Sequence, residues 1–150
     1  MLKKIVWGVV AVLVLVVSFG VIRTLTTPDH LYAASGEFAG CPSRPSCVSS
    51  RADSADHQID PLSYNGQMSV VVSRLERIVS AMDGVRDVHR EGNYIHAVFQ
   101  TPVMKYRDDL ELLVGADGIM DVRSISRFGY RDFGVNRARV EALREAYSGS

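Results

Sequence analysis

Residues 108–126 read DDLELLVGADGIMDVRSIS and decide the fold. Two stretches rich in apolar residues, Asp108 to Val114 and Ile119 to Ser126, flank the turn-forming run of residues 115–118. Gly118 suits the left-handed position that ends a three-residue hairpin loop. The segment therefore predicts two antiparallel strands joined by a tight turn.

The pairing register decides which side chains of this hairpin share a face. A three-residue loop pairs Val114 with Met120 and Leu112 with Val122. A slip of one residue would place Leu112 opposite Asp121 and mix apolar with charged side chains, so we favour the three-residue loop. The predicted core face consists of Leu110, Leu112, Val114, Met120, Val122 and Ser124. The opposite face consists of Asp109, Glu111, Leu113, Asp121, Arg123 and Ile125, with Arg123 across from Glu111.

The segments before this hairpin predict one helix and two more strands. Apolar residues at helical spacing from Met68 to Met82 predict an amphipathic helix, with Asn65 as its cap and Gly84 as its stop. Val85 to Arg90 and Tyr94 to Gln100 predict a second hairpin.

A last helix is predicted from near Asn136, because Val140, Leu143 and Tyr147 fall on one side of it. The predicted fold class is therefore α+β: an N-terminal transmembrane helix, then a small antiparallel four-stranded sheet with flanking helices, in the order helix-β-β-β-β-helix. Both flanking helices are expected on one face of the sheet.

The N-terminus predicts an uncleaved membrane anchor. Ile5 to Ile22 carries no charge, and 18 helical residues span roughly 27 Å, enough to cross a bilayer core. Ala33 to Ser35, the nearest candidate cleavage site, lies too far downstream for a signal peptide. Two lysines and the α-amino group before the run outweigh Arg23 after it, which predicts a cytoplasmic N-terminus; Arg23 leaves the opposite orientation as the alternative.

The chain is therefore predicted to have three parts: an anchor at residues 1–23, an irregular linker at 24–40 and an extracytoplasmic α+β domain at 41–150. The predicted location is the inner (cytoplasmic) membrane, crossed once, with the C-terminal domain in the periplasm or another extracytoplasmic space.

Cys41 and Cys47 are predicted to form a disulfide, because an extracytoplasmic space is oxidising. Pro42 and Pro45 stiffen the intervening loop. The spacing is not that of Cys-x-x-Cys redox or haem motifs, and two thiols alone make an incomplete zinc site.

The charge balance argues against a nucleic-acid partner. Residues after Arg23 include 14 basic and 17 acidic side chains, a formal net charge of −3. The expected partners are the lipid bilayer, through residues 5–22, and either envelope proteins or a small anionic ligand; no nucleic acid is expected.

Several motifs together resemble one known family. They are residues 41–50 (CPSRPSCVSS), 108–111 (DDLE), 122–130 (VRSISRFGY) and 132–137 (DFGVNR). This combination is similar to the bacterial and plastid domain of unknown function 1499 family, over about residues 41–147. Ser46 departs from the pattern, because the family usually has Asn there. The resemblance implies the fold and an envelope setting, and it brings no agreed activity.

One polar cluster is the candidate ligand site. Its members are Asp109, Glu111, Arg123, Ser126, Arg127, Asp132, Asn136 and Arg137. In one interpretation Arg123, Arg127 and Arg137 converge on the N-terminus of the last helix and bind an anion. In the other, acids and arginines pair with each other and Asn136 caps the helix. Residues 105–144 contain eight basic and seven acidic side chains, a balance that favours the paired scaffold.

Enzyme signals are weaker. Asp109 and Glu111 share a strand face, but Arg123 opposite them would keep both ionised. The four histidines have no ligand-like spacing and no serine stands in a nucleophile elbow, so we predict no catalytic residue, metal site or cofactor. The expected function is a membrane-anchored accessory or binding module of the cell envelope. The alternative is a hydrolase-like or anion-ligand-binding enzyme that uses Asp109, Glu111 and Arg123.

Overall fold

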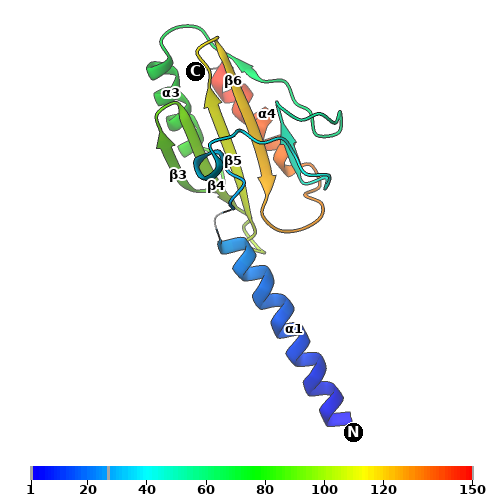
Figure 1. Cartoon of the computed structure of the whole chain (residues 1–150). Coiled ribbons are helices and arrows are strands. Elements are labelled where there is room, and N and C mark those ends of the chain that lie inside the picture. Colours follow the sequence, from blue (N-terminus) through cyan, green and yellow to red (C-terminus); the bar gives the residue numbers. More distant parts are fainter. Residues whose placement is uncertain (1, 27, 150) are drawn as a thin grey trace.

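The protein consists of a long N-terminal helix and one α+β domain (Figure 1). The computed structural model describes residues 2–26 and 28–149. Helix α1 (Leu2–Leu25) extends away from the domain. Its segment Lys3–Ile22 has a mean hydropathy of 2.9, and none of it is buried inside the protein. By length and composition this helix fits a membrane span or a signal sequence, and the sequence predicts the first of these.

The sheet has six strands, so the prediction of four strands was wrong. The strands are β1 (Cys47–Ser49), β2 (Leu62–Ser63), β3 (Val85–Glu91), β4 (Tyr94–Gln100), β5 (Arg107–Val114) and β6 (Ile119–Ser126). Their order is β1-β6-β5-β4-β3, and β2 also pairs with β6. All strand pairs are antiparallel. The two missed strands are three and two residues long, too short to show an alternating pattern.

The predicted register of the central hairpin is confirmed. Val114 pairs with Met120, and Glu111 pairs with Arg123. Gly118 has a φ angle of 83°, the left-handed conformation that the three-residue loop requires. The Gly115 N–H donates to the Ile119 carbonyl and closes the turn.

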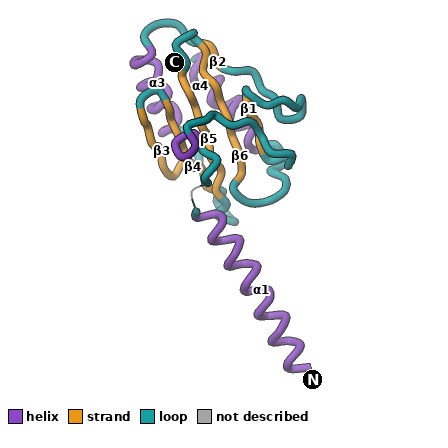
Figure 2. Tube along the Cα trace, viewed as in Figure 1, coloured by secondary structure: helices purple, strands orange, loops and turns teal. Residues whose placement is uncertain are grey.

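The two long helices, α3 (Met68–Ser80) and α4 (Val135–Ser148), cover one face of the sheet (Figure 2). Between helices and sheet lies the apolar core, which includes the whole predicted apolar set of β5 and β6. Asn65 does not cap α3: the helix begins after Gln67, with no side-chain cap bond. The predicted boundary at Gly84 lies four residues beyond the end of the helix.

The other face of the sheet is covered by the segment that follows α1. This segment contains the short helix α2 (Tyr32–Ser35), where an irregular linker was predicted. Leu31 and Phe38 are buried against the domain. Because this segment is packed, the domain follows α1 closely in the chain and is not suspended on a long free tether.

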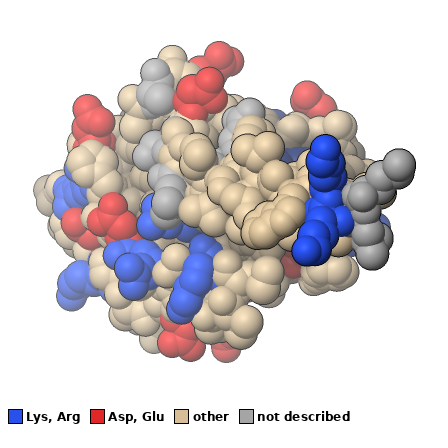
Figure 3. Space-filling view, turned by 90° about the horizontal axis from the view of Figure 1, so that it is seen from below, with Lys and Arg blue, Asp and Glu red and all other residues tan. Residues whose placement is uncertain are grey.

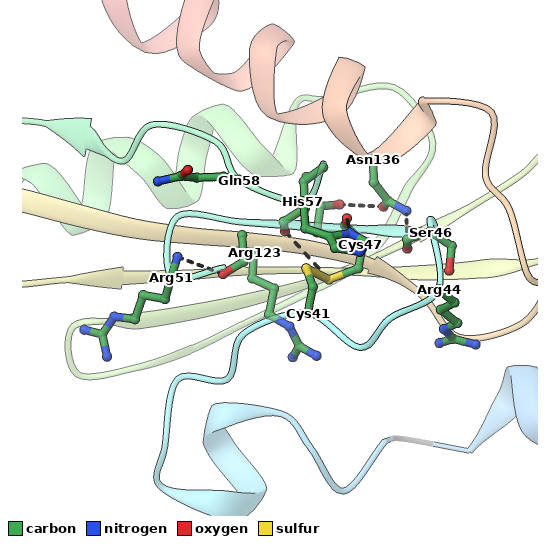
Figure 4. Close-up of a disulfide and its surroundings, with 12 residues drawn as sticks. Cys41, Arg44, Ser46, Cys47, Arg51, His57, Gln58, Arg123 and Asn136 are labelled. Carbon is green, nitrogen blue, oxygen red and sulfur yellow. Dashed lines mark hydrogen bonds between the residues drawn. A yellow bond between two sulfur atoms is a disulfide. The ribbon is translucent and has the colours of Figure 1, made fainter. Parts of the chain in front are cut away.

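The predicted Cys41–Cys47 disulfide is present, with the two Cα atoms 5.7 Å apart (Figure 4). It closes a loop with a sequence separation of 6 immediately before β1. Asn136 and Ser46 lie beside it in the same view. The bridge therefore fixes the loop that leads the chain into the edge strand of the sheet.

We predict that replacing both cysteines, Cys41→Ser/Cys47→Ser, lowers the free energy of unfolding by about 2–3 kcal/mol, because the unfolded chain regains loop entropy. Urea denaturation measures the change. Thiol labelling of the native protein without reductant is expected to fail, and full labelling would contradict the bridge.

Candidate functional site

The sheet separates the predicted site residues onto two faces. Alternation along β5 and β6 places Asp109, Glu111 and Arg123 on the face away from the helices. Arg127, just after β6, joins them through Asp109. Ser126 is on the opposite face, against α4, where its hydroxyl meets Asn136. We call Asp109, Glu111, Arg123 and Arg127, with Tyr94 and His96 of β4, the outer-face cluster.

The centre of the outer-face cluster is a buried ion pair. Arg123 Nη1 lies 2.7 Å from Glu111 Oε2, and the side chains are 2% and 1% exposed. The other carboxylate oxygen accepts hydrogen bonds from the Tyr94 hydroxyl and from the Tyr32 backbone N–H, both at 2.8 Å. Arg123 also donates to the His30 carbonyl, at 3.4 Å. The carboxylate is thus neutralised and bonded from three directions.

A second buried carboxylate is paired in the same way. Arg127 donates two hydrogen bonds to Asp109, with Nε 2.9 Å from Oδ2 and Nη2 2.7 Å from Oδ1. His96 Nε2 lies 2.7 Å from Oδ1. Burial opposes ionisation, but the hydrogen bonds from His96 and Arg127 and the charge of Arg127 together lower the pKa of Asp109. Asp109 is therefore ionised at neutral pH.

Two neighbouring groups are also shifted. Burial, followed by the charge and hydrogen bond of Glu111, raises the pKa of the Tyr94 hydroxyl. Burial and then the charge of Arg123 lower the pKa of His30. Tyr94 therefore remains a hydrogen-bond donor, and His30 favours its neutral form. Neither shift prepares a nucleophile at neutral pH.

A second polar group lies between the sheet and α4, and we call it the helix-face cluster: Asp108, Ser124, Ser126, Asn136 and Arg139. Asn136 Oδ1 accepts from Ser124 and Arg139, and its Nδ2 donates to Ser126 and to the Ser46 carbonyl. Arg139 pairs with Asp108 at 2.7 Å. This cluster therefore joins α4, β5, β6 and the disulfide loop.

Arg139 and Asp108 were not among the predicted site residues. The sequence contains a signal for both residues. Asp108 alternates with Leu110 and Leu112 and therefore lies on the core face of its strand, and Arg139 is one helical turn after Asn136.

Asn136 does not cap α4, contrary to the second interpretation of the cluster. The helix begins after Gly134, which has a left-handed backbone. Asp132 accepts hydrogen bonds from the N–H groups of Gly134 and Asn136, so it satisfies the first turn. Asn136 is two residues past the capping position, inside the helix and fully buried.

The three arginines of the predicted anion pocket do not converge. Arg123 and Arg127 lie on the outer face of the sheet, whereas Arg137 is on α4 and donates to the carbonyls of Asp56 and Gln58. The reason is the two-residue period of a strand, which directs odd-numbered side chains of β6 away from the helix. Arg137 and Asp132 instead line a cavity of about 370 Å³ beside the disulfide loop.

The arrangement of the two polar clusters favours a structural role. The buried carboxylates of both clusters, Asp108, Asp109 and Glu111, each have an arginine partner within 2.7 Å. Over residues 2–26 and 28–149, no three His, Cys, Asp or Glu side chains are grouped so that they could bind a metal ion. Closed pairs of this kind correspond to the scaffold interpretation of the sequence.

Comparison with known proteins agrees with the motifs. The model of the family described as "Protein of unknown function (DUF1499)" matches residues 37–147. The chain belongs to the DUF1499 family. No curated protein and no solved structure matches it. Both polar clusters lie within the DUF1499 region, whereas His30 and Tyr32, which bond to the outer-face cluster, precede it.

We predict that Arg123→Ala lowers the free energy of unfolding by about 3–5 kcal/mol, because Glu111 stays buried without its counter-charge. Glu111→Gln/Arg123→Met should recover at least half of the loss, since it removes both charges and keeps an oxygen acceptor for Tyr32 and Tyr94. Urea denaturation measures each variant.

The matched control is Arg51→Ala, which breaks the more exposed pair with Asp121 and should cost less than about 1 kcal/mol. An unchanged melting temperature of Arg123→Ala would show that the domain does not depend on the buried pair.

We predict a pH-dependent cost for Asp109→Asn. The folded-state pKa of Asp109 is lowered, so its contribution to stability is complete above the ordinary carboxyl pKa of about 3.9 and is lost as the pH falls through the folded-state value. The variant should therefore lose about 3 kcal/mol at pH 7. The difference in free energy of unfolding between variant and wild type should become smaller below about pH 4.

Chemical denaturation at several pH values measures that gap. Asp53→Asn, at an exposed position, is the control and should stay within about 0.5 kcal/mol of wild type at every pH. A gap for Asp109→Asn that stays constant down to about pH 2 would contradict the assigned role of this carboxylate.

Proposed function

We propose that this protein is a single-pass membrane protein whose DUF1499 domain lies on the extracytoplasmic side and acts as an accessory or binding module of the cell envelope, not as an enzyme. The observation that carries the proposal is the closed outer-face cluster. Its two carboxylates are buried and paired, and the segment that leaves α1 donates a hydrogen bond to one of them, Glu111. The cluster fixes the domain to its anchor.

The membrane part of the proposal is supported by the exposed surface of α1. The segment Lys3–Ile22 is 20 residues long and packs into no core of the protein. At 1.5 Å per residue it spans about 30 Å, the thickness of the hydrocarbon layer of a bilayer. Insertion into lipid removes this apolar surface from water, whereas packing against the domain does not cover it.

The extracytoplasmic side is supported by charge and by the disulfide. Lys3 and Lys4 precede the apolar run, and positive residues favour the cytoplasmic side. Disulfides persist in oxidising compartments, and the Cys41–Cys47 bridge lies in the domain that follows the helix.

The non-enzymatic role is supported by the state of the polar groups. A hydrolase needs a carboxylate, histidine or hydroxyl that can reach a substrate and exchange a proton. Asp109 and Glu111 are fully covered, and their oxygens already accept bonds from arginine, histidine and tyrosine. Opening this cluster to a substrate would break buried ion pairs. The outer-face cluster therefore holds segments of the chain together.

We predict that two charges in the middle of the anchor, Val12→Arg/Leu15→Arg, release the protein from alkali-washed membranes, because each arginine at the bilayer centre costs about 2.5–3.5 kcal/mol. Sedimentation after carbonate extraction measures the bound fraction. Val70→Arg, on the exposed side of α3, is the control and should leave the bound fraction unchanged.

The side of the membrane is tested with Ala116→Cys, in the exposed turn between β5 and β6. A membrane-impermeant maleimide should label this thiol in intact spheroplasts. Labelling only after lysis would refute the orientation, and a mature chain lacking its first thirty residues would refute the anchor.

A further inference from the structure

Two loops of the domain lie beside the C-terminal turns of α1. They connect β4 to β5 (residues 101–106) and β6 to α4 (residues 127–134). The Phe128 ring packs against Gly20, where an added Cβ would come within 3.3 Å of the ring. A cavity of about 460 Å³ between helix and loops is lined by Val17 and Val21 on one side and by Met104 and Phe128 on the other.

This contact indicates how deep in the membrane the two loops lie. If Lys3–Ile22 spans the hydrocarbon layer, Ile22 marks its outer boundary. Gly20 then lies about 3 Å inside that boundary, at a rise of 1.5 Å per residue. Side chains that touch Gly20 and Val21, such as Phe128, are therefore at the level of the lipid headgroups or just below it.

The same two loops expose apolar side chains, although contact of such side chains with water is unfavourable. Val103 is 82% exposed, Met104 62% and Tyr130 73%. Tyr106 and Phe128 add two aromatic rings whose centroids are 5.5 Å apart. Tyrosine and other amphipathic rings are enriched at the boundary between membrane and water. Clustered exposed apolar residues at one end of a domain are typical of an interaction surface.

The charges at this end fit a lipid surface. Lys105 lies between the apolar Met104 and Tyr106, and a long lysine side chain can reach headgroup phosphates while its stem stays in the apolar layer. Arg131 is exposed on the second loop. Figure 3 views the molecule from the end that carries α1 and shows both basic and acidic side chains around an uncharged area that includes this helix.

The backbone of the loops is consistent with a functional surface. Lys105 and Phe133 have φ angles of 56° and 57°, a left-handed conformation that residues other than glycine rarely adopt. Such strained residues concentrate at functional sites, where the surrounding structure holds them in place.

We propose that the loops at residues 101–106 and 127–134 insert their apolar side chains into the interfacial layer of the bilayer that holds α1, so that the domain docks on the lipid surface. The proposal rests on the anchoring proposed above. The short connection supports it: α1 ends at Leu25 and Leu31 is already buried on the domain, so six residue steps span at most about 20 Å. The connection therefore keeps Leu31, and the part of the domain that it packs on, within about 20 Å of the end of α1.

The test uses the full-length protein in phosphatidylcholine vesicles. The native cysteines are bridged, so a single introduced thiol takes an environment-sensitive fluorophore. The loop variants are Met104→Cys and Tyr130→Cys. Ala116→Cys, at the other end of β5 and about 25 Å away, is the matched control. Val12→Cys reports on the anchor itself. Quenching by spin-labelled lipid measures contact with the membrane.

We expect quenching at positions 104 and 130 to be at least three times that at position 116, with strong quenching at position 12. Strong quenching at 12 but values at 104 and 130 equal to that at 116 would overturn the docking proposal and leave the anchor intact. Absence of quenching at 12 would refute the anchor instead. Each variant must retain the wild-type melting temperature; Val103→Cys replaces Met104→Cys if that variant does not.

Discussion

The ion pair between Glu111 and Arg123 is the interaction on which the rest of this structure depends. Two charges in a water-free interior are stable only when they face each other and most of their remaining donors and acceptors are used. Within the described residues, both Glu111 oxygens accept hydrogen bonds, whereas the Arg123 Nε–H has no partner. The pair requires that β5 and β6 align in one register, since a shift of one residue would separate the two side chains. It also requires Tyr94 from β4 and Tyr32 from the segment after α1. One carboxylate thus connects four parts of the chain.

The segment between α1 and the first strand covers the face of the sheet that points away from α3 and α4. An antiparallel sheet can leave one face in water, and a charged outer face would ordinarily be solvated. Here the chain from His30 to Phe38 covers that face, and its backbone supplies a donor to Glu111, from Tyr32, and an acceptor to Arg123, from His30. Because the covering segment continues directly from α1, the position of the helix and the packing of the domain are linked.

The disulfide loop has the equivalent role on the other face. The Ser46 carbonyl accepts hydrogen bonds from the Ser126 backbone and the Asn136 side chain. The Cys41–Cys47 bridge holds this carbonyl at the edge of β6. A loop without regular structure therefore contributes to the packing of α4 against the sheet. Both polar clusters serve assembly, which accounts for a large set of polar residues in which no carboxylate is left open.

Short-range patterns in the chain were enough to predict α1, the disulfide, the four long strands and the register of the central hairpin. Those features depend on neighbours within about ten residues, through alternation, turn chemistry and uninterrupted hydropathy. Alternation extended by one residue would also have placed Ser126 on the face opposite Arg123. Only the folded chain shows that Tyr32 meets Glu111 across 79 positions and that Asn136 meets Ser46 across 90. Such contacts join segments whose local sequence has no periodic signal, because the partner of a buried polar group is chosen by three-dimensional packing.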